Sequence, residues 1–184
     1  MKKILVPLAK GFEEIEAISI IDVLRRAGAE VVVASVSGND CVCSTHNVRV
    51  LADCALGSVD SSAFDMIALP GGSEGAMTLS KDALAQKLIK EFHAKGKFVA
   101  AICAAPIALH AAGILQNVPY TCYPGCQTQI GGLYTEDKNV VVSDKIITSR
   151  GPATALAFAL TLVEALFGTP KAKELAAGML KTCC

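Results

Sequence analysis

Short apolar runs alternate with segments of helical periodicity along nearly the whole chain, and this alternation restricts the fold more than any other feature. The aliphatic and β-branched runs typical of buried strands are 4–8, 31–36, 66–69 and 98–102. The segments with apolar residues at helical spacing are 13–27, 83–95, 105–112, 153–167 and 172–181. Weaker signals predict a short strand at 49–52 and a hairpin formed by 140–143 and 146–148. Strands separated by helices indicate βαβ units, so we predict a doubly wound, mainly parallel α/β sheet with helices on both faces.

The length of the chain and the continuity of this pattern predict one domain, over residues 1–184. A chain of 184 residues is long enough to bury a sizeable core. Its hydrophobic residues, 52% of the total, are sufficient to fill that core. The sequence contains no internal repeat, low-complexity tract or linker that would mark a boundary.

Charge and hydropathy argue against nucleic acid and membranes as partners. Seventeen basic residues balance seventeen acidic ones, so no net field recruits a polyanion or an anionic surface. The first residues faintly resemble a signal peptide, but Lys10 and Glu13 interrupt the apolar run and no small-residue cleavage site follows. No apolar stretch approaches the length needed to span a bilayer. We therefore predict a cytoplasmic protein.

The cysteines do not indicate a disulfide scaffold or a metal module. There are eight of them, at positions 41, 43, 54, 103, 122, 126, 183 and 184. A disulfide framework is typical of small secreted chains with a poor core, which this is not. Their spacing lacks the paired C-x-x-C of zinc modules, and we expect neither a metal nor a cofactor. The terminal pair Cys183-Cys184 could accept a lipid, but we expect an unmodified tail.

The chemistry of such a fold is expected at one edge of the sheet. Open parallel sheets bind ligands at the carboxyl ends of their strands, near the point where strand order reverses. Three segments of this chain should reach that edge: 10–16, 70–73 and 100–106.

Cys103 is the most suggestive residue at that edge. It stands where a buried strand passes into a helix, with small residues on either side, as in a nucleophile elbow. A thiol at a helix N-terminus is expected to have a lowered pKa, because the partial positive charge there favours the thiolate. The backbone N–H groups of Ala104 and Gly72 could then hold a developing oxyanion. The alternative is a buried core cysteine, and the residues alone leave the two interpretations open.

The other two segments are less specific. The turn Pro70-Gly71-Gly72 is either an ordinary chain reversal or a loop whose backbone approaches a ligand. Glu13, Glu14 and Glu16 open a helix, where the dipole favours carboxylates in any case. One of them could face inward over the sheet edge, and the sequence does not say which.

Five segments in the same order resemble the ThiJ/PfpI superfamily, and within it the branch of the parkinsonism-associated protein deglycase (DJ-one). The segments are Leu8–Glu16, Asp22–Gly28, Leu69–Gly72, Ala100–Pro106 and Thr148–Thr154. The resemblance runs over nearly the whole chain. It implies a flavodoxin-like fold and a homodimer.

The resemblance also implies site residues and an activity. Cys103 matches the family's reactive cysteine, Glu16 the carboxyl group that hydrogen-bonds it, and Gly72 and Ala104 the neighbouring backbone amides. The implied chemistry needs no cofactor and acts on reactive dicarbonyls: a glyoxalase activity that converts methylglyoxal into lactate, and a deglycase activity on glycated protein or nucleotide. The same cysteine is implied to protect against oxidative stress as a sensor that is oxidised to the sulfinate.

The chain departs from the family pattern in one loop. Relatives place a His where this chain has Tyr123, and a phenol, which titrates near pH 10, is a poor base at neutrality. His46 lies in a segment that resembles a ligand-facing one, where relatives often carry Arg, and could reach the pocket. His93 and His110 sit on predicted helices and are expected to be surface or packing residues.

Four functions are therefore compared. The first is an enzyme that acts on methylglyoxal, glyoxal or their adducts through Cys103 and Glu16. The second is a non-enzymatic redox sensor or chaperone that uses the same thiol. The third, a cysteine peptidase or amidase, is disfavoured because such relatives carry His directly after the nucleophile, where this chain has Ala104. The last is a purely structural protein.

Overall fold

The computed structural model describes residues 1–181 and contains the predicted mainly parallel sheet. The Cys183-Cys184 pair lies outside the described residues. Seven strands form the sheet in the order β5-β2-β1-β6-β7-β9-β8. The strands are β1 (Lys3–Leu8), β2 (Glu30–Ser35), β5 (Cys54–Ala55), β6 (Met66–Leu69), β7 (Phe98–Ile102), β8 (Val140–Ser143) and β9 (Ile146–Ser149). Every neighbouring pair is parallel except β8 and β9, which form the predicted antiparallel hairpin.

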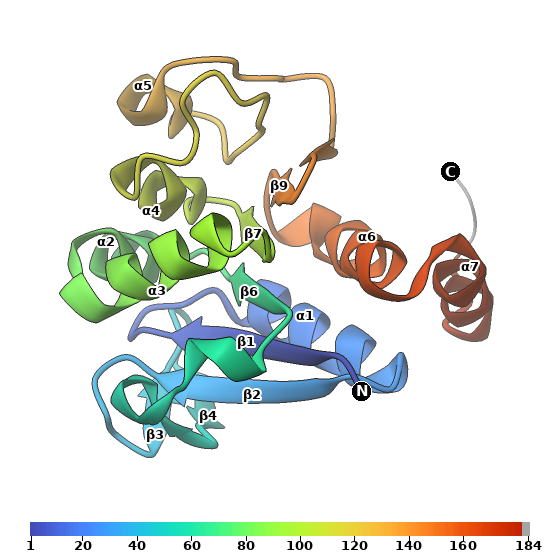
Figure 1. Ribbon diagram of the computed structural model, residues 1–184, viewed down its shortest axis with the longest axis horizontal. Helices are drawn as coiled ribbons and strands as arrows, with labels where there is room; N and C mark the ends of the chain where they lie inside the picture. The colour runs from blue at the N-terminus through green and yellow to red at the C-terminus, as the bar shows by residue number, and fades with distance from the viewer. Residues whose placement is uncertain (182–184) are drawn as a thin grey trace.

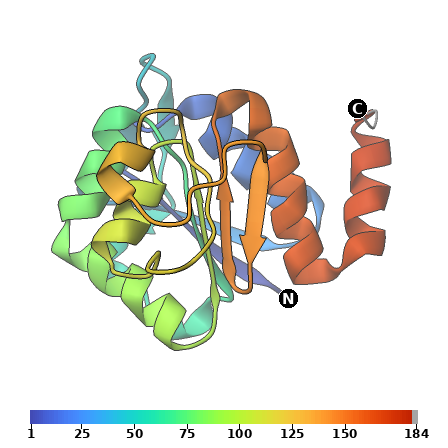
Figure 2. The same ribbon diagram turned by 90° about the horizontal axis from the view of Figure 1, so that it is seen from above.

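Helices cover both faces of this sheet, as expected for a flavodoxin-like α/β fold (Figure 1). One face carries α1 (Glu14–Arg26) and α6 (Ala155–Phe167), and the other carries α2 (Ser73–Lys81), α3 (Ala83–Ala94) and α4 (Pro106–Ala111). The last helix, α7 (Thr169–Gly178), packs on α6 at the outside of the molecule, and Figure 2 shows it beyond the helical layer. The same view shows the segment between α4 and β8, which includes α5 (Gln127–Ile130), crossing in front of the sheet.

The alternation of side chains along β1 divides the core into two layers. Ile4, Val6 and Leu8 pack toward α1 and α6, whereas Leu5 packs toward α3 and α4. All four side chains are fully buried. Successive residues of a strand point to opposite faces, so a strand that is apolar throughout must be covered on both sides.

Two short strands outside the main sheet form a hairpin. β3 (Cys41–Cys43) pairs antiparallel with β4 (Arg49–Leu51), where we predicted only a single short strand. Three residues per strand are too few to show a periodic pattern, which explains why the pairing was missed.

Helix α2 was not predicted, and α7 was misplaced. The sequence of α2 begins Ser73-Glu74-Gly75, a polar start that follows two glycines and has little apolar periodicity. Gly75 is buried there, and a Cβ on it would lie 3.0 Å from the backbone nitrogen of Phe12. Close packing of the helix, rather than its propensity, explains this glycine. Helix α7 begins at Thr169 and ends at Gly178, earlier than the predicted 172–181, because Pro170 takes the first turn of a helix.

None of the helices within residues 1–181 has both the length and the apolar character needed to cross a bilayer.

Candidate active site

The three segments expected at the carboxyl edge of the sheet meet there. The strand order reverses between β1 and β6, and the loops after these strands lie side by side. The backbone N–H of Glu13 donates to the carbonyl of Gly71 at 3.0 Å, and the N–H of Gly71 donates to Oε2 of Glu16 at 2.8 Å. The third segment brings Cys103 against the same glycine. The switch point of the sheet is therefore built as predicted.

Cys103 occupies a strained turn directly after β7. Its φ is 64°, in the left-handed region that non-glycine residues seldom adopt. The turn is held by two backbone hydrogen bonds: the N–H of Cys103 donates to the carbonyl of Ser149 at 3.0 Å, and its carbonyl accepts from Tyr123 at 2.8 Å. The residue is 8% exposed, so the thiol lies just below the surface. The backbone geometry resembles a nucleophile elbow more than an ordinary core position.

Gly71 and Gly72 leave the space in which this thiol sits. A Cβ on Gly71 would lie 2.5 Å from Cys103 Cβ and 2.7 Å from Glu16 Oε2. Gly72 has a φ of 91°, and its backbone N–H points at the Cys103 sulfur together with that of Ala104. Both amides lower the pKa of the thiol, as expected for donors that favour a negative sulfur.

Glu16 is the glutamate that faces Cys103. It lies in the first turn of α1, is fully buried, and has Cys103 beside its carboxyl group. Burial, followed by the negative charge of Glu13, raises the pKa of Glu16 to about 7, against the opposing effects of the Gly71 N–H and the Cys103 thiol. A carboxyl group with such a pKa can take or give a proton at neutrality.

The pKa of Cys103 differs from the prediction. Burial, followed by the negative charge of Glu16, raises the pKa of Cys103 to about 12. The prediction of a lowered pKa was wrong because burial and the Glu16 charge outweigh the two backbone amides that favour the thiolate. Helix α4, which begins only at Pro106 and has six residues, is too short to reverse this. Because part of the increase comes from the Glu16 charge, it applies while Glu16 is ionised. Above pH 7 the pair therefore holds one proton, which the thiol keeps at rest, and the ionised Glu16 is the adjacent acceptor.

Tyr123, whose backbone N–H donates to the Cys103 carbonyl, borders an open hollow. Its side chain is half exposed, and its ring lies against Gly151. A Cβ added to Gly151 would lie 3.2 Å from Cδ2 of Tyr123. The hollow has a volume of about 280 Å³. Its lining residues are Tyr123, Pro124, Asn139, Arg150, Gly151, Pro152, Ala153 and Thr154.

His46 does not contact Cys103 or Glu16. Its Nδ1 lies 2.7 Å from Oε1 of Glu14, and its side chain is 73% exposed. His93 and His110 lie on exposed positions of α3 and α4.

Two contacts of the site were not predicted from the sequence. Oε2 of Glu13 accepts from the N–H of Glu16 at 2.8 Å, which fixes the start of α1, and Ser149 anchors the Cys103 turn through its carbonyl. Acidic residues in a first helical turn are common, and a backbone carbonyl leaves no trace in the sequence. Neither contact could therefore have been predicted.

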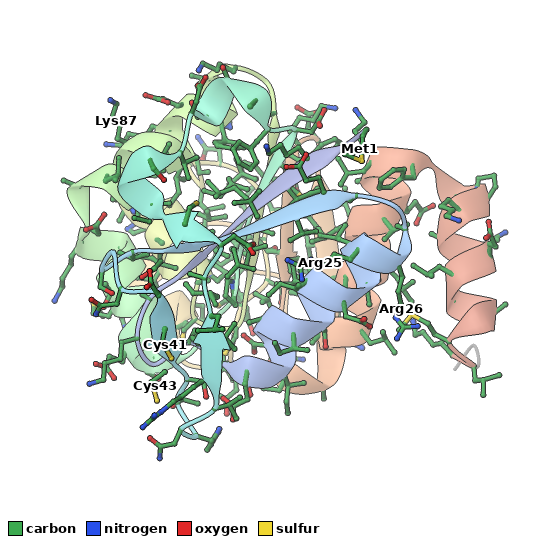
Figure 3. All side chains as sticks on the ribbon, turned by 90° about the horizontal axis from the view of Figure 1, so that it is seen from below. Met1, Arg25, Arg26, Cys41, Cys43 and Lys87 are labelled. Carbon is green, nitrogen blue, oxygen red and sulfur yellow. The ribbon has the colours of Figure 1, made fainter. Side chains whose placement is uncertain are left out.

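The six cysteines within residues 1–181 are all free thiols. Cys122 is buried, and burial raises its pKa to about 12. Cys41 and Cys43 lie on the β3–β4 hairpin at the surface of the molecule, as Figure 3 shows.

A sheet of this order with a cysteine on a strained turn facing a buried carboxyl group defines a class of thiol-bearing flavodoxin-like proteins. The family model described as DJ-1/PfpI matches residues 2–165, and the chain belongs to this family. The chain is 41% identical over 181 residues to Protein dj-1beta of Drosophila melanogaster, covering 97% of each protein. It is 39% identical over 174 residues to the Caenorhabditis elegans protein named glutathione-independent glyoxalase DJR-1.2, covering 94% of this chain and 90% of that one.

A longer relative and a solved structure also match this chain. Protein DJ-1 homolog B of Arabidopsis thaliana is 42% identical over 175 residues, but this chain, matched over 94% of its length, spans only 40% of that protein. The oxidized form of Toxoplasma gondii DJ-1 has a similar structure, with a TM-score of 0.95, 44% identity and 100% coverage of both chains.

Proposed function

We propose that this protein is a cofactor-independent enzyme of the glyoxalase type, which acts on methylglyoxal and related dicarbonyls or their glycated adducts through Cys103 and Glu16. The observation that carries the proposal is the position of the Cys103 thiol, on a turn with φ 64°, beside the buried carboxyl group of Glu16 and the amides of Gly72 and Ala104. A relative that bears the name of such an enzyme, at 39% identity, supports it.

The first step is addition of the thiol to the aldehyde carbon of the substrate. Sulfur forms a bond to carbon while its proton passes to the Glu16 carboxylate, and the aldehyde oxygen then takes that proton to complete a hemithioacetal. Glu16 suits this exchange because its pKa, raised to about 7 by burial, lies near the working pH. A free thiolate is not required at rest.

The second step moves hydrogen between the two substrate carbons. A base removes the proton from the former aldehyde carbon, the pair of electrons forms an enediol, and a proton is returned to the neighbouring carbon. The product is a thioester of lactate, which water cleaves to lactate and the free thiol. The ionised Glu16 is the base that lies beside the sulfur. Tyr123, whose backbone N–H donates to the Cys103 carbonyl, borders a neighbouring hollow, and we propose that this hollow receives the other end of the substrate.

A redox role of the same cysteine is the second candidate function. Two molecules of peroxide convert a thiol into a sulfinic acid and two of water. The resulting sulfinate would accept a hydrogen bond from protonated Glu16 and from the amides that now face the sulfur. Such a sulfinate would support the proposed protection against oxidative stress. No observation favours a peptidase, since Ala104 follows the thiol.

We further propose that the protein acts as a homodimer through α1. Ile15 and Ile18 are large apolar side chains of this helix that remain 56% and 44% exposed. A hollow of about 240 Å³ lies beside them, lined also by Leu156 of α6 and Met179. Exposed apolar surface of this kind is typical of an interface. The cytoplasmic location and the absence of nucleic-acid and membrane partners stay predictions.

Two assays on the same preparation test the two functions. Lactate formed from methylglyoxal is measured for the wild type, for Cys103→Ser, and for Cys126→Ser as a control thiol. The enzyme hypothesis expects Cys103→Ser to lose at least a hundredfold and Cys126→Ser to retain activity. Mass spectrometry after limited peroxide tests the sensor, which expects two added oxygens on Cys103 before any other cysteine. Sulfinate without lactate would leave only the redox role.

A further inference from the structure

Three metal-binding side chains converge outside the thiol site. Glu13 and Glu14 stand at the start of α1, and His46 comes from the loop of the β3–β4 hairpin. One donor atom from each residue lies within 4.8 Å of the other two. Side chains more than thirty positions apart in the sequence therefore present an imidazole and two carboxylates to one point.

The backbone holds the two segments together independently of these side chains. The N–H of Gly11 donates to the carbonyl of Cys43 at 2.8 Å, and the N–H of Thr45 donates to the carbonyl of Phe12 at 2.8 Å. Phe12 and Ser44 also form a parallel bridge. The loop that carries His46 is thus fixed against the start of α1, so the cluster is preorganised.

The hydrogen bonds of the cluster leave one oxygen without a partner. Oε1 of Glu14 lies 2.7 Å from His46 Nδ1, whereas its Oε2 is buried, with no well-aligned hydrogen bond among the described residues and only the Ser44 hydroxyl as a nearby donor. Glu13 is itself 6% exposed, with Oε2 occupied by the Glu16 N–H. A buried carboxylate oxygen without a well-aligned donor is costly, and a pair between His46 and Glu14 alone does not satisfy it.

We propose that Glu13, Glu14 and His46 bind a divalent first-row transition cation of the Zn²⁺ type. Imidazole nitrogen and carboxylate oxygen are preferred ligands of such ions, and water would complete the coordination. The N-terminus of α1 opposes a cation with a partial charge of about +0.5, which two carboxylates outweigh. The site uses no cysteine, so the spacing of the thiols, from which we expected no metal, gives no information about it. It does not depend on the proposed enzymatic function.

Cobalt is the probe that separates this site from the thiols. The full chain is first stripped with chelator, and Co²⁺ is then titrated while the visible and near-ultraviolet spectrum is recorded. We expect one Co²⁺ per chain, with weak ligand-field bands and without the intense near-ultraviolet band that thiolate ligation produces. A strong thiolate band at one equivalent would overturn the proposal, because a cysteine outside the cluster would then be a ligand.

Three variants identify the ligands. His46→Ala and Glu14→Gln should each weaken Co²⁺ binding at least tenfold, whereas His93→Ala, an exposed histidine on α3, should bind like the wild type. His46 is largely exposed and contributes only one contact, to Glu14, so the metal-free His46→Ala protein should remain folded. Wild-type affinity in His46→Ala would overturn the proposal, as would equal weakening in His93→Ala.

Discussion

Gly71 donates its backbone N–H to Oε2 of Glu16 at 2.8 Å, at a point where any side chain on residue 71 would strike both Glu16 and Cys103. This contact joins the loop after β6 to the first turn of α1, and it aligns the buried carboxyl group with the sulfur. The absence of a Cβ at one position is therefore a condition for the acid and the thiol to meet.

We expect Gly71→Ala to destabilise the fold and disrupt the site. The new Cβ would lie 2.5 Å from Cys103 Cβ and 2.9 Å from the Ile102 carbonyl, so the backbone must shift, at a cost of about 2 kcal/mol. Urea unfolding measures this cost, and alkylation of Cys103 by iodoacetamide reports the displaced thiol. Gly57→Ala is the matched control, since its nearest neighbour would be Leu84 Cδ2 at 3.9 Å. Equal stability of the two variants would contradict the packing argument.

Glu16→Gln should slow alkylation of Cys103 at neutral pH. In the wild type, the rate should rise as pH increases through about 7, because the carboxylate that accepts the thiol proton forms in that range. The amide cannot accept the proton, so the rise should move into the alkaline range of an unassisted thiol and the rate at pH 7.5 should fall about tenfold. The rates are measured with chelator present. Superimposable pH profiles would remove Glu16 from the mechanism.

The same raised pKa predicts how stability depends on pH. Burial raises the pKa of Glu16 from 4.5 to about 7, so the folded state holds a proton that the unfolded state has lost. This contribution to stability is complete below pH 4.5 and is lost as pH rises through 7. Glu16→Gln should therefore be more stable than the wild type at pH 8, by about 3 kcal/mol, and nearly equal to it at pH 4.5. Denaturant unfolding of both proteins, with chelator present, measures the difference in free energy of unfolding at the two pH values. A difference that grows as the pH falls would contradict this prediction.

The sequence allowed the central strands to be predicted because their apolar runs are buried on both faces of the sheet, and most helices because one face of each is apolar. Strands 66–69, 98–102 and 140–143 have the predicted bounds. The meeting of three loops at the switch point followed from topology alone. Helix α2 could not be predicted in this way, because Gly75 weakens its apolar periodicity. This glycine is explained only by its contact with Phe12.

The chemistry of the site was less predictable than its position. The three glutamates at the start of α1 look equivalent in the sequence, and only the helix phase turns Glu16 inward. The pKa of Cys103 was predicted with the wrong sign, because it depends on burial and on the Glu16 charge more than on a helix terminus. The contact between His46 and Glu14 joins two segments whose pairing leaves no local signal.

Ile18→Glu should convert the proposed dimer into a monomer. Ile18 is 44% exposed on α1, so a carboxylate there would be solvated in the single chain but buried without a partner in an interface. Light scattering should show the mass halved and the circular dichroism unchanged. Val142→Glu, at a 57% exposed position of β8, is the control and should keep the wild-type mass. A wild-type protein that is monomeric would refute the dimer directly.

Tyr123→His should increase lactate production from methylglyoxal at pH 7. The N–H of residue 123 donates to the Cys103 carbonyl at 2.8 Å, so the backbone keeps a side chain at this position beside the site whichever residue is present. An imidazole titrates near pH 6.5 and can accept the carbon-bound proton at neutrality, whereas a phenol cannot, so we expect a gain of about tenfold or more. Tyr123→Phe serves as the control: unchanged activity would show that the hydroxyl takes no part, and a loss would show that it orients the substrate. A histidine variant no faster than the wild type would mean that Glu16 alone moves the proton, because the second base would then be dispensable.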